Sequence, residues 1–192
     1  MVTTSWRELP GPARAIGAAV TRAVDAAGDA DRDAYEESAG ELVTHPSEAT
    51  GIVLAAVVRS MLEEQHPDGL DGDDIQLILG RCYRGAAAWL PPERIDVDTL
   101  IAVLASALGI QEAGITYDEI GPPPPGLVGD GDEWRDPVAD DEKPRKAPTA
   151  SAYAWHAPLI IADMLAASGR SLPRYLDGAF AEIVRGETME MP

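Results

Sequence analysis

Apolar residues of this chain recur at steps of three and four, the spacing that keeps side chains on one face of an α-helix. The first such stripe comprises Ala15, Ile16, Ala19, Val20, Ala23 and Val24. Pro12 precedes the stripe where it suits the first turn of a helix, and Gly28 follows it where it suits a helix end. The pattern therefore predicts a helix over residues 11–28.

Four further stripes predict helices over residues 33–43, 46–65, 71–90 and 96–109. The segment 46–65 has a wide apolar face, so we expect its helix to be central. The acidic residues within 71–74 suit the start of a helix, where the helix dipole favours negative charge. Short connections between these helices are typical of antiparallel neighbours in a bundle.

The helical pattern stops in the segment 121–148, which is rich in proline and acidic residues. Four consecutive prolines occupy positions 122–125, and such a run favours an extended backbone and excludes a helix. A segment of this kind is a linker, a lid or a partner-binding arm. We expect deletion of residues 123–146 to leave the helices intact and to abolish the main binding activity.

Two stripes after this arm predict two closing helices that dock back on the first five. The fold class expected for residues 1–192 is therefore all-α, a single-domain helical bundle of about seven helices with the irregular segment 121–148. The residues predicted to be largely buried are Ile52, Val57, Met61, Ile78, Leu79, Cys82, Leu100, Leu104, Leu165 and Phe180.

The net charge of −18 is concentrated, because the segments 25–41 and 63–74 supply two-thirds of it. Charge confined to helix ends and connections leaves the stripes free to pack, which indicates a folded acidic protein. Acidity argues against nucleic acid and against anionic membranes as partners. It suits a protein partner with a basic surface.

The cysteine content and the apolar runs bear on the cellular compartment. Cys82 is the single cysteine, so no disulfide framework is expected within the chain. No basic region followed by an apolar run occurs near residue 1, and the longest apolar run, 52–58, is far too short to span a bilayer. These features predict a cytoplasmic location.

Two patterns resemble parts of metal sites but are incomplete. The acids Asp29, Asp31 and Asp33 alternate as in a calcium loop, yet the loop lacks its glycine and its terminal glutamate. Glu63 and His66 have the spacing of a di-iron half-site, and the second half-site is absent. We therefore expect no metal ligands.

The sequence also lacks the common signatures of catalysis and cofactor binding. It contains no nucleophile elbow, no phosphate-binding loop and no dinucleotide fingerprint. Cys82 falls on an apolar helix face, where a cysteine is usually inert packing. No catalytic residue and no cofactor is predicted.

Arg81 and Arg84 stand out because the residues around them are mostly apolar. They lie three apart on one helix face and are expected to form an ion-pair network with acids near Asp73. The alternative is an anion pocket with Tyr83 or Trp89 as a wall.

Two hypotheses for the function follow. The first is a non-catalytic regulatory or accessory protein that acts through protein–protein interaction, with Trp134 of the arm at the contact. Its partners would be a basic protein or a second copy of the chain in a homodimer. The second is a helical small-molecule-binding protein or enzyme whose site the segment 121–148 closes. Its lining residues would be Tyr83, Trp89, His156 and Asp163. The last two share a helix face only if the helix continues through Pro158, which is a helix-breaking residue. A deep pocket containing His156 or Arg84 would favour the second hypothesis.

Overall fold

The computed structural model describes residues 5–109 and 149–189, with side chains up to residue 185. Within these ranges the protein is all-α, as predicted: seven α-helices and two short 3-10 turns, with no strand. The elements are η1 Trp6–Glu8, α1 Gly11–Gly28, α2 Arg32–Thr44, α3 Ser47–Gln65, α4 Gly72–Ala87, η2 Pro92–Arg94, α5 Val97–Ala107, α7 Ala150–Ser168 and α8 Leu172–Met189. The proline-rich arm 121–148 lies outside the described residues.

Acidic side chains begin three of these helices. The Asp31 carboxylate accepts a hydrogen bond from the Ala34 backbone N–H at the start of α2. At the start of α4, Asp71 and Asp74 each accept from the backbone N–H of the other, which is a capping box. The Asp96 carboxylate caps α5 by accepting a hydrogen bond from the Asp98 backbone N–H. The acidic connections that dominate the charge therefore serve to define helix starts.

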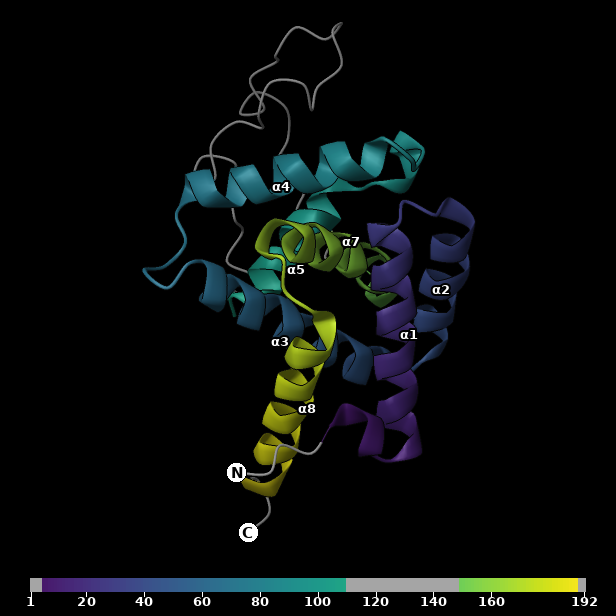
Figure 1. Cartoon of the computed structure of the whole chain (residues 1–192), viewed down its shortest axis with the longest axis vertical. Helices are drawn as coiled ribbons and strands as arrows, with labels where there is room; N and C mark the ends of the chain where they lie inside the picture. Colours follow the sequence, from purple (N-terminus) through teal and green to yellow (C-terminus); the bar gives the residue numbers. More distant parts are fainter. Residues whose placement is uncertain (1–4, 110–148, 190–192) are drawn as a thin grey trace, which may run out of the picture.

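Helix α7 lies in the middle of the molecule and packs against α1, α2, α3, α4 and α5 (Figure 1). Pro158 lies inside α7 and is buried, and the helix continues through it. Helix α3, which the sequence predicts to be central, packs on α7, α8 and α5. In the described ranges, no helix combines the length and the apolar character needed to cross a membrane.

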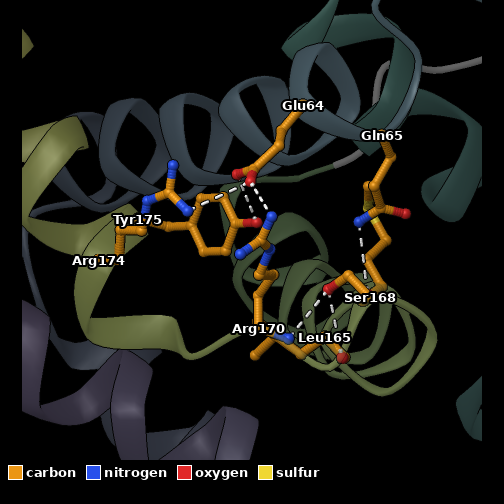
Figure 2. A network of polar contacts seen from close by, with 8 residues as sticks. Glu64, Gln65, Leu165, Ser168, Arg170, Arg174 and Tyr175 are labelled. Carbon is orange, nitrogen blue, oxygen red and sulfur yellow. Dashed lines mark hydrogen bonds and ion pairs between the residues drawn. The ribbon is translucent and has the colours of Figure 1, made fainter.

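Helix α8 docks across α3 through a polar network around Glu64 (Figure 2). One oxygen of the Glu64 carboxylate lies 3.1 Å from Arg170 and 3.2 Å from Arg174. The other oxygen accepts a hydrogen bond of 2.9 Å from the Tyr175 hydroxyl. A further ion pair, Arg59 to Glu182 at 2.7 Å, joins the same two helices. The expected return of the last helices onto the first five is thus confirmed.

Most of the predicted core residues are buried, and one prediction is wrong. The confirmed residues are Val57, Met61, Ile78, Leu79, Cys82, Leu100, Leu104 and Phe180. Leu165 is half-buried. Ile52 is 48% exposed because it lies on the solvent-facing side of α3, seven and eleven residues before Arg59 and Glu63. The wide apolar face of α3 extends past the area that its neighbours cover.

Candidate functional site

Arg81 and Asp163, both candidates from the sequence, form an ion pair between α4 and α7. The Arg81 Nε donates to both carboxylate oxygens of Asp163, at 2.9 and 2.8 Å, and Nη2 lies 2.8 Å from Oδ2. The Asp163 side chain is only 15% exposed. Its hydrogen bonds raise the pKa of the Arg81 guanidinium. The acid paired with Arg81 comes from α7 and not from the acids near Asp73.

The other candidates on α4 do not join this pair. Arg84 is exposed and has no ion pair with an acid in the described ranges. Tyr83 is half-buried against the core. Trp134 lies outside the described residues. The described side chains that were expected to form an anion pocket therefore make separate contacts and do not form one site.

Trp89 belongs to an aromatic cluster in the core, just beyond the end of α4. The Tyr35 ring meets the Trp89 ring edge-on at 5.3 Å and the Trp155 ring at 5.5 Å between centroids. The Tyr35 hydroxyl donates to the Trp155 carbonyl oxygen. Tyr35 is fully buried, and burial raises its pKa well above the ordinary value. This cluster joins α2 to α7 and leaves no open ring face at Tyr35 for a ligand.

His156 uses both ring nitrogens in hydrogen bonds to the backbone. Nδ1 lies 2.7 Å from the Ala152 carbonyl oxygen, and Nε2 accepts from the Asp96 backbone N–H at 2.9 Å. This arrangement requires the neutral ring with its proton on Nδ1. Burial lowers the pKa of His156, which keeps the ring neutral. The side chain therefore ties the start of α5 to α7.

Cys82 and the potential metal ligands of the described residues are in the following positions. Cys82 is buried and free, and burial raises its pKa, so it is a protonated thiol at neutral pH. In residues 5–109 and 149–185, no three His, Cys, Asp or Glu side chains come close enough to hold a metal ion. His66 caps the end of α3, and its Nδ1 lies 3.5 Å from Asp74 Oδ2.

The structure instead forms a hollow of about 290 Å³ where the ends of α2 and α5 meet the starts of α3 and α7. Its wall consists of Leu42, Val43, His45, Ser47, Thr50, Gly51, Ser106, Ala150, Ser151, Tyr153 and Ala154. Five of these side chains carry a hydroxyl group, one is an imidazole, and none carries a carboxylate, an amine or a guanidinium. The surface of the hollow is mostly apolar, and its polar side-chain groups are five hydroxyls and the His45 imidazole.

The chain makes this hollow by a sharp change of direction between α2 and α3. His45 ends α2, and its backbone N–H donates to the Leu42 carbonyl oxygen at 3.2 Å. Pro46 precedes α3 and offers no side-chain oxygen to the first turn of that helix. Opposite it, Thr149 caps α7 by accepting from the Ala152 N–H at 3.2 Å. Two helix starts and two helix ends are thereby brought to one place.

Three polar atoms in this wall are buried and lack a hydrogen-bond partner: His45 Nε2, Thr50 Oγ1 and Tyr153 Oη. Thr50 is only 1% exposed. In the described residues only Trp6 Nε1 and Arg81 Nη2 share this condition, and Arg81 Nη2 is already 2.8 Å from Asp163. Because an unpaired buried polar group costs about 1–3 kcal/mol, three in one wall are unusual.

Tyr153 and Val43 define the character of two sides of the hollow. Burial raises the pKa of Tyr153, and the nearby Ser106 hydroxyl opposes this shift, although the two hydroxyls do not meet in hydrogen-bond geometry. Val43 is a large apolar residue exposed at the rim. The hollow thus combines hydroxyl groups, of which Ser47, Ser106 and Ser151 belong to exposed residues, with apolar surface.

Sequence reasoning missed this hollow because its residues come from four separate segments. The available signal was the cluster of hydroxyl residues at predicted helix ends, such as Ser47, Thr50 and Ser151. Such residues normally cap helices, and periodicity does not tell which helix ends meet. Neither His156 nor Arg84 lines the hollow. Comparison of the chain with protein-family models, with curated proteins and with solved structures gives no match, so the site itself must carry the functional argument.

Proposed function

We propose that this protein binds a small polar molecule in the hollow between α2, α3, α5 and α7. The observation that carries the proposal is the set of three unpartnered buried atoms on His45, Thr50 and Tyr153. More than nine in ten buried polar groups in folded proteins are paired, and a ligand placed here would supply the missing partners. The volume of about 290 Å³ lies at the small end of ligand pockets.

This proposal follows the second sequence-based hypothesis in kind, with different lining residues. His156, Asp163 and Arg81 hold helices together through their own hydrogen bonds. The binding groups are instead hydroxyls and one imidazole at helix ends. A cytoplasmic location belongs to the same proposal and is supported by the free, buried state of Cys82.

A leucine at position 51 tests the location of the site. Gly51 lines the hollow, and nothing lies within 4 Å of a Cβ built on it, so Gly51→Leu is expected to fill the hollow without a backbone clash. Gly40 in α2 has equally open surroundings, and Gly40→Leu is the matched control.

Binding is measured by amide NMR titration with myo-inositol, D-glucose, sodium phosphate, sodium acetate and ammonium chloride. At least one probe is expected to shift the amides of residues 47–51 and 150–154 in a saturable manner. Gly51→Leu should remove the shifts and Gly40→Leu should leave them. Shifts that survive Gly51→Leu would contradict the proposed site.

A second candidate function is binding of a basic protein partner through the outer face of α4. Leu77 on this face is 59% exposed, and the exposed acid Asp73 lies one helical turn before it, close to the exposed cap residue Asp71. The segment 63–74 contains six acids and no lysine or arginine, and this negative charge would attract a basic surface. A second copy of the chain is another partner that an exposed apolar helix face can take.

Sedimentation analysis and titration with oligolysine test this second candidate. Leu77→Ser should leave the helical content unchanged and weaken either self-association or oligolysine binding. An unchanged mass and an unchanged oligolysine affinity in the variant would remove α4 as an interaction surface.

A further inference from the structure

We infer that the molecule bound in the hollow is uncharged and carries several hydroxyl groups, as a cyclic polyol or a monosaccharide does. This inference rests on the proposed function of the hollow and specifies its ligand. It is carried by the charge of the wall, by the kind of hydrogen-bonding groups in it and by its apolar surfaces.

Among the described residues, the wall offers no carboxylate, amine or guanidinium as a charged partner for an ionic ligand. A buried charge is stable only when it is paired, so an organic anion or cation would lose hydration without compensation here. The net charge of −18 on the whole chain further disfavours an anion.

The helix termini around the hollow also offset one another. Helices α3 and α7 begin there, and their first turns carry partial positive charge. Helices α2 and α5 end there, and their last turns carry partial negative charge. The partial charges of the helix termini therefore offset one another, and the surroundings have no strong preference for either sign of charge.

Hydroxyl groups on a ligand match this wall better than other uncharged groups. Five side chains of the wall end in a hydroxyl, namely Ser47, Thr50, Ser106, Ser151 and Tyr153. A hydroxyl group donates one hydrogen bond and accepts two, so it can pair with another hydroxyl in either direction. A ketone or an ether only accepts hydrogen bonds, so it would leave acceptor atoms of the wall without a donor. Several ligand hydroxyls could therefore satisfy Thr50 Oγ1, Tyr153 Oη and His45 Nε2 together.

Apolar groups complete the wall and favour a ring over an open chain. Leu42, Ala150 and Ala154 line the hollow, and the exposed Val43 borders it. A ring polyol presents C–H groups on its faces and hydroxyls at its edge, which suits a wall of mixed character. The ring is also preorganised, so it loses less conformational freedom on binding than an open chain.

The experiment compares five probes by amide NMR titration at constant ionic strength: myo-inositol, D-glucose, the open-chain polyol sorbitol, sodium phosphate and ammonium chloride. We expect saturable shifts at residues 47–51 and 150–154 with myo-inositol or D-glucose, and weaker ones with sorbitol. Phosphate and ammonium should give none. Preference between the two ring probes identifies the cyclitol or the sugar as the source of the hydroxyls.

Three variants connect these shifts to the named atoms. Thr50→Val and Tyr153→Phe each remove one hydroxyl and should weaken binding about five- to tenfold, the effect of one hydrogen bond. Thr21→Val removes a hydroxyl that donates to the Gly17 carbonyl oxygen on α1, outside the hollow, and should leave the affinity unchanged. Because Tyr153→Phe and Thr50→Val alter different helices, a folding defect in one leaves the other as the test.

The outcomes separate the inference from the proposed function. Saturable binding of phosphate or ammonium in the hollow, without binding of the hydroxyl probes, would overturn the inference and leave the proposed function standing. No saturable binding of any probe would overturn both and would assign the hollow to water. Hydroxyl-probe shifts that are linear and spread over the whole protein would also overturn the inference, because they indicate a solvent effect.

Discussion

Thr50 and Thr99 are both buried threonines in the first turns of helices, and they differ in one hydrogen bond. The Thr99 hydroxyl donates to the Asp96 carboxylate at 2.5 Å, whereas Thr50 Oγ1 has no partner. Thr99→Val should lower the free energy of unfolding by about 1–2 kcal/mol, because a bonded carboxylate loses its donor. Thr50→Val should raise it by about 1 kcal/mol, because the change removes a buried unpaired group of nearly the same shape.

Urea unfolding of the two variants beside the wild-type protein measures these opposite signs. Since valine and threonine have almost the same volume, packing contributes little to the difference. A loss of stability in Thr50→Val equal to that in Thr99→Val would show that Thr50 Oγ1 is hydrogen-bonded in solution. In that case a bound water is the hydrogen-bond partner of Thr50 Oγ1, and the wall of the hollow has one fewer unpartnered atom for a ligand to satisfy.

His156 gives the protein a predictable response to mild acid. Burial lowers its folded-state pKa below the ordinary value of 6.5, so below about pH 6.5 the unfolded chain binds more protons than the folded one. The contribution of His156 to stability is therefore complete above that pH and is lost as the pH falls towards the folded-state pKa. Asp96 and the Ala152 carbonyl oppose the shift in part.

The test is the slope of unfolding free energy against pH between about 7 and 5.5, in the wild-type protein and in His156→Gln. Stability should fall with decreasing pH in both, and the fall should be shallower in the variant. His156→Gln also loses hydrogen bonds. This loss lowers the free energy of unfolding equally at every pH, so it does not contribute to the difference in slope. Equal slopes would show that another group controls this range.

Helices α4 and α7 are joined by the Arg81–Asp163 pair, whose value a double-mutant cycle isolates. Asp163 is largely buried and accepts two bonds from one guanidinium nitrogen, so a coupling of about 1–2 kcal/mol is expected. The Arg22–Glu41 pair joins α1 to α2 with both side chains about half exposed and serves as the control. It should show little or no coupling. Equal couplings would mean that burial of Asp163 adds nothing.

Helix α5 tests how well a stripe of apolar residues identifies packing. Leu104 on α5 is almost fully buried, and Leu104→Ala should lower the free energy of unfolding by about 2–5 kcal/mol. Ile52→Ala, at a position that the stripe also marked, should change it by less than about 0.5 kcal/mol because the side chain faces solvent. Chemical denaturation measures both. A large loss in Ile52→Ala would mean that a partner or another segment covers it in solution.

The contrast between Leu104 and Ile52 shows which features of the elements are accessible from sequence. Helix spacing identifies which residues can share a face, and proline, glycine and capping acids identify where helices end. These local rules predict α1 and α3 to within a residue or two. They do not tell how much of a wide apolar face a neighbour covers, since that depends on the angle between the helices.

At the scale of the whole molecule, the hollow depends on contacts that no local rule contains. Residues 42–51, 106 and 150–154 are separated by long stretches of sequence and meet only because α7 packs between the other helices. His156 and Asp163 illustrate the same point. The sequence predicts them as binding residues, but in the folded protein both form hydrogen bonds that join helices. Sequence therefore predicts the helices and much of the core, and the structure is needed to place the site.

The acidic segments are also separated in space. In Figure 1 the connection between α1 and α2 and the connection between α3 and α4 lie on opposite sides of the molecule. A basic partner of ordinary size would contact one of them at a time. The two-thirds of the net charge that these segments carry is thus divided between two separate parts of the surface.

Deletion of residues 123–146 tests how much of the protein the described helices supply on their own. These helices already form one continuous core that includes residues of α1, α3, α5, α7 and α8. The described helices on either side of the deletion, α5 and α7, lie close together at these ends, since Ser106 and Ala150 line the same hollow. Shortening a connection changes closure entropy little, with about 0.6 kcal/mol for each halving of length. Circular dichroism and the melting midpoint should therefore remain close to those of the full chain.

The same deletion decides between the arm and the hollow as the main binding element. All the described residues that line the hollow remain in the shortened chain, so myo-inositol or D-glucose should still shift the amides of residues 47–51 and 150–154. The sequence pattern alone predicts the opposite, namely that binding is lost with the arm. Retained helices with lost probe binding would favour the arm, and retained helices with unchanged affinity would favour the hollow. A loss of helical signal would instead show that residues 123–146 help to hold the core together.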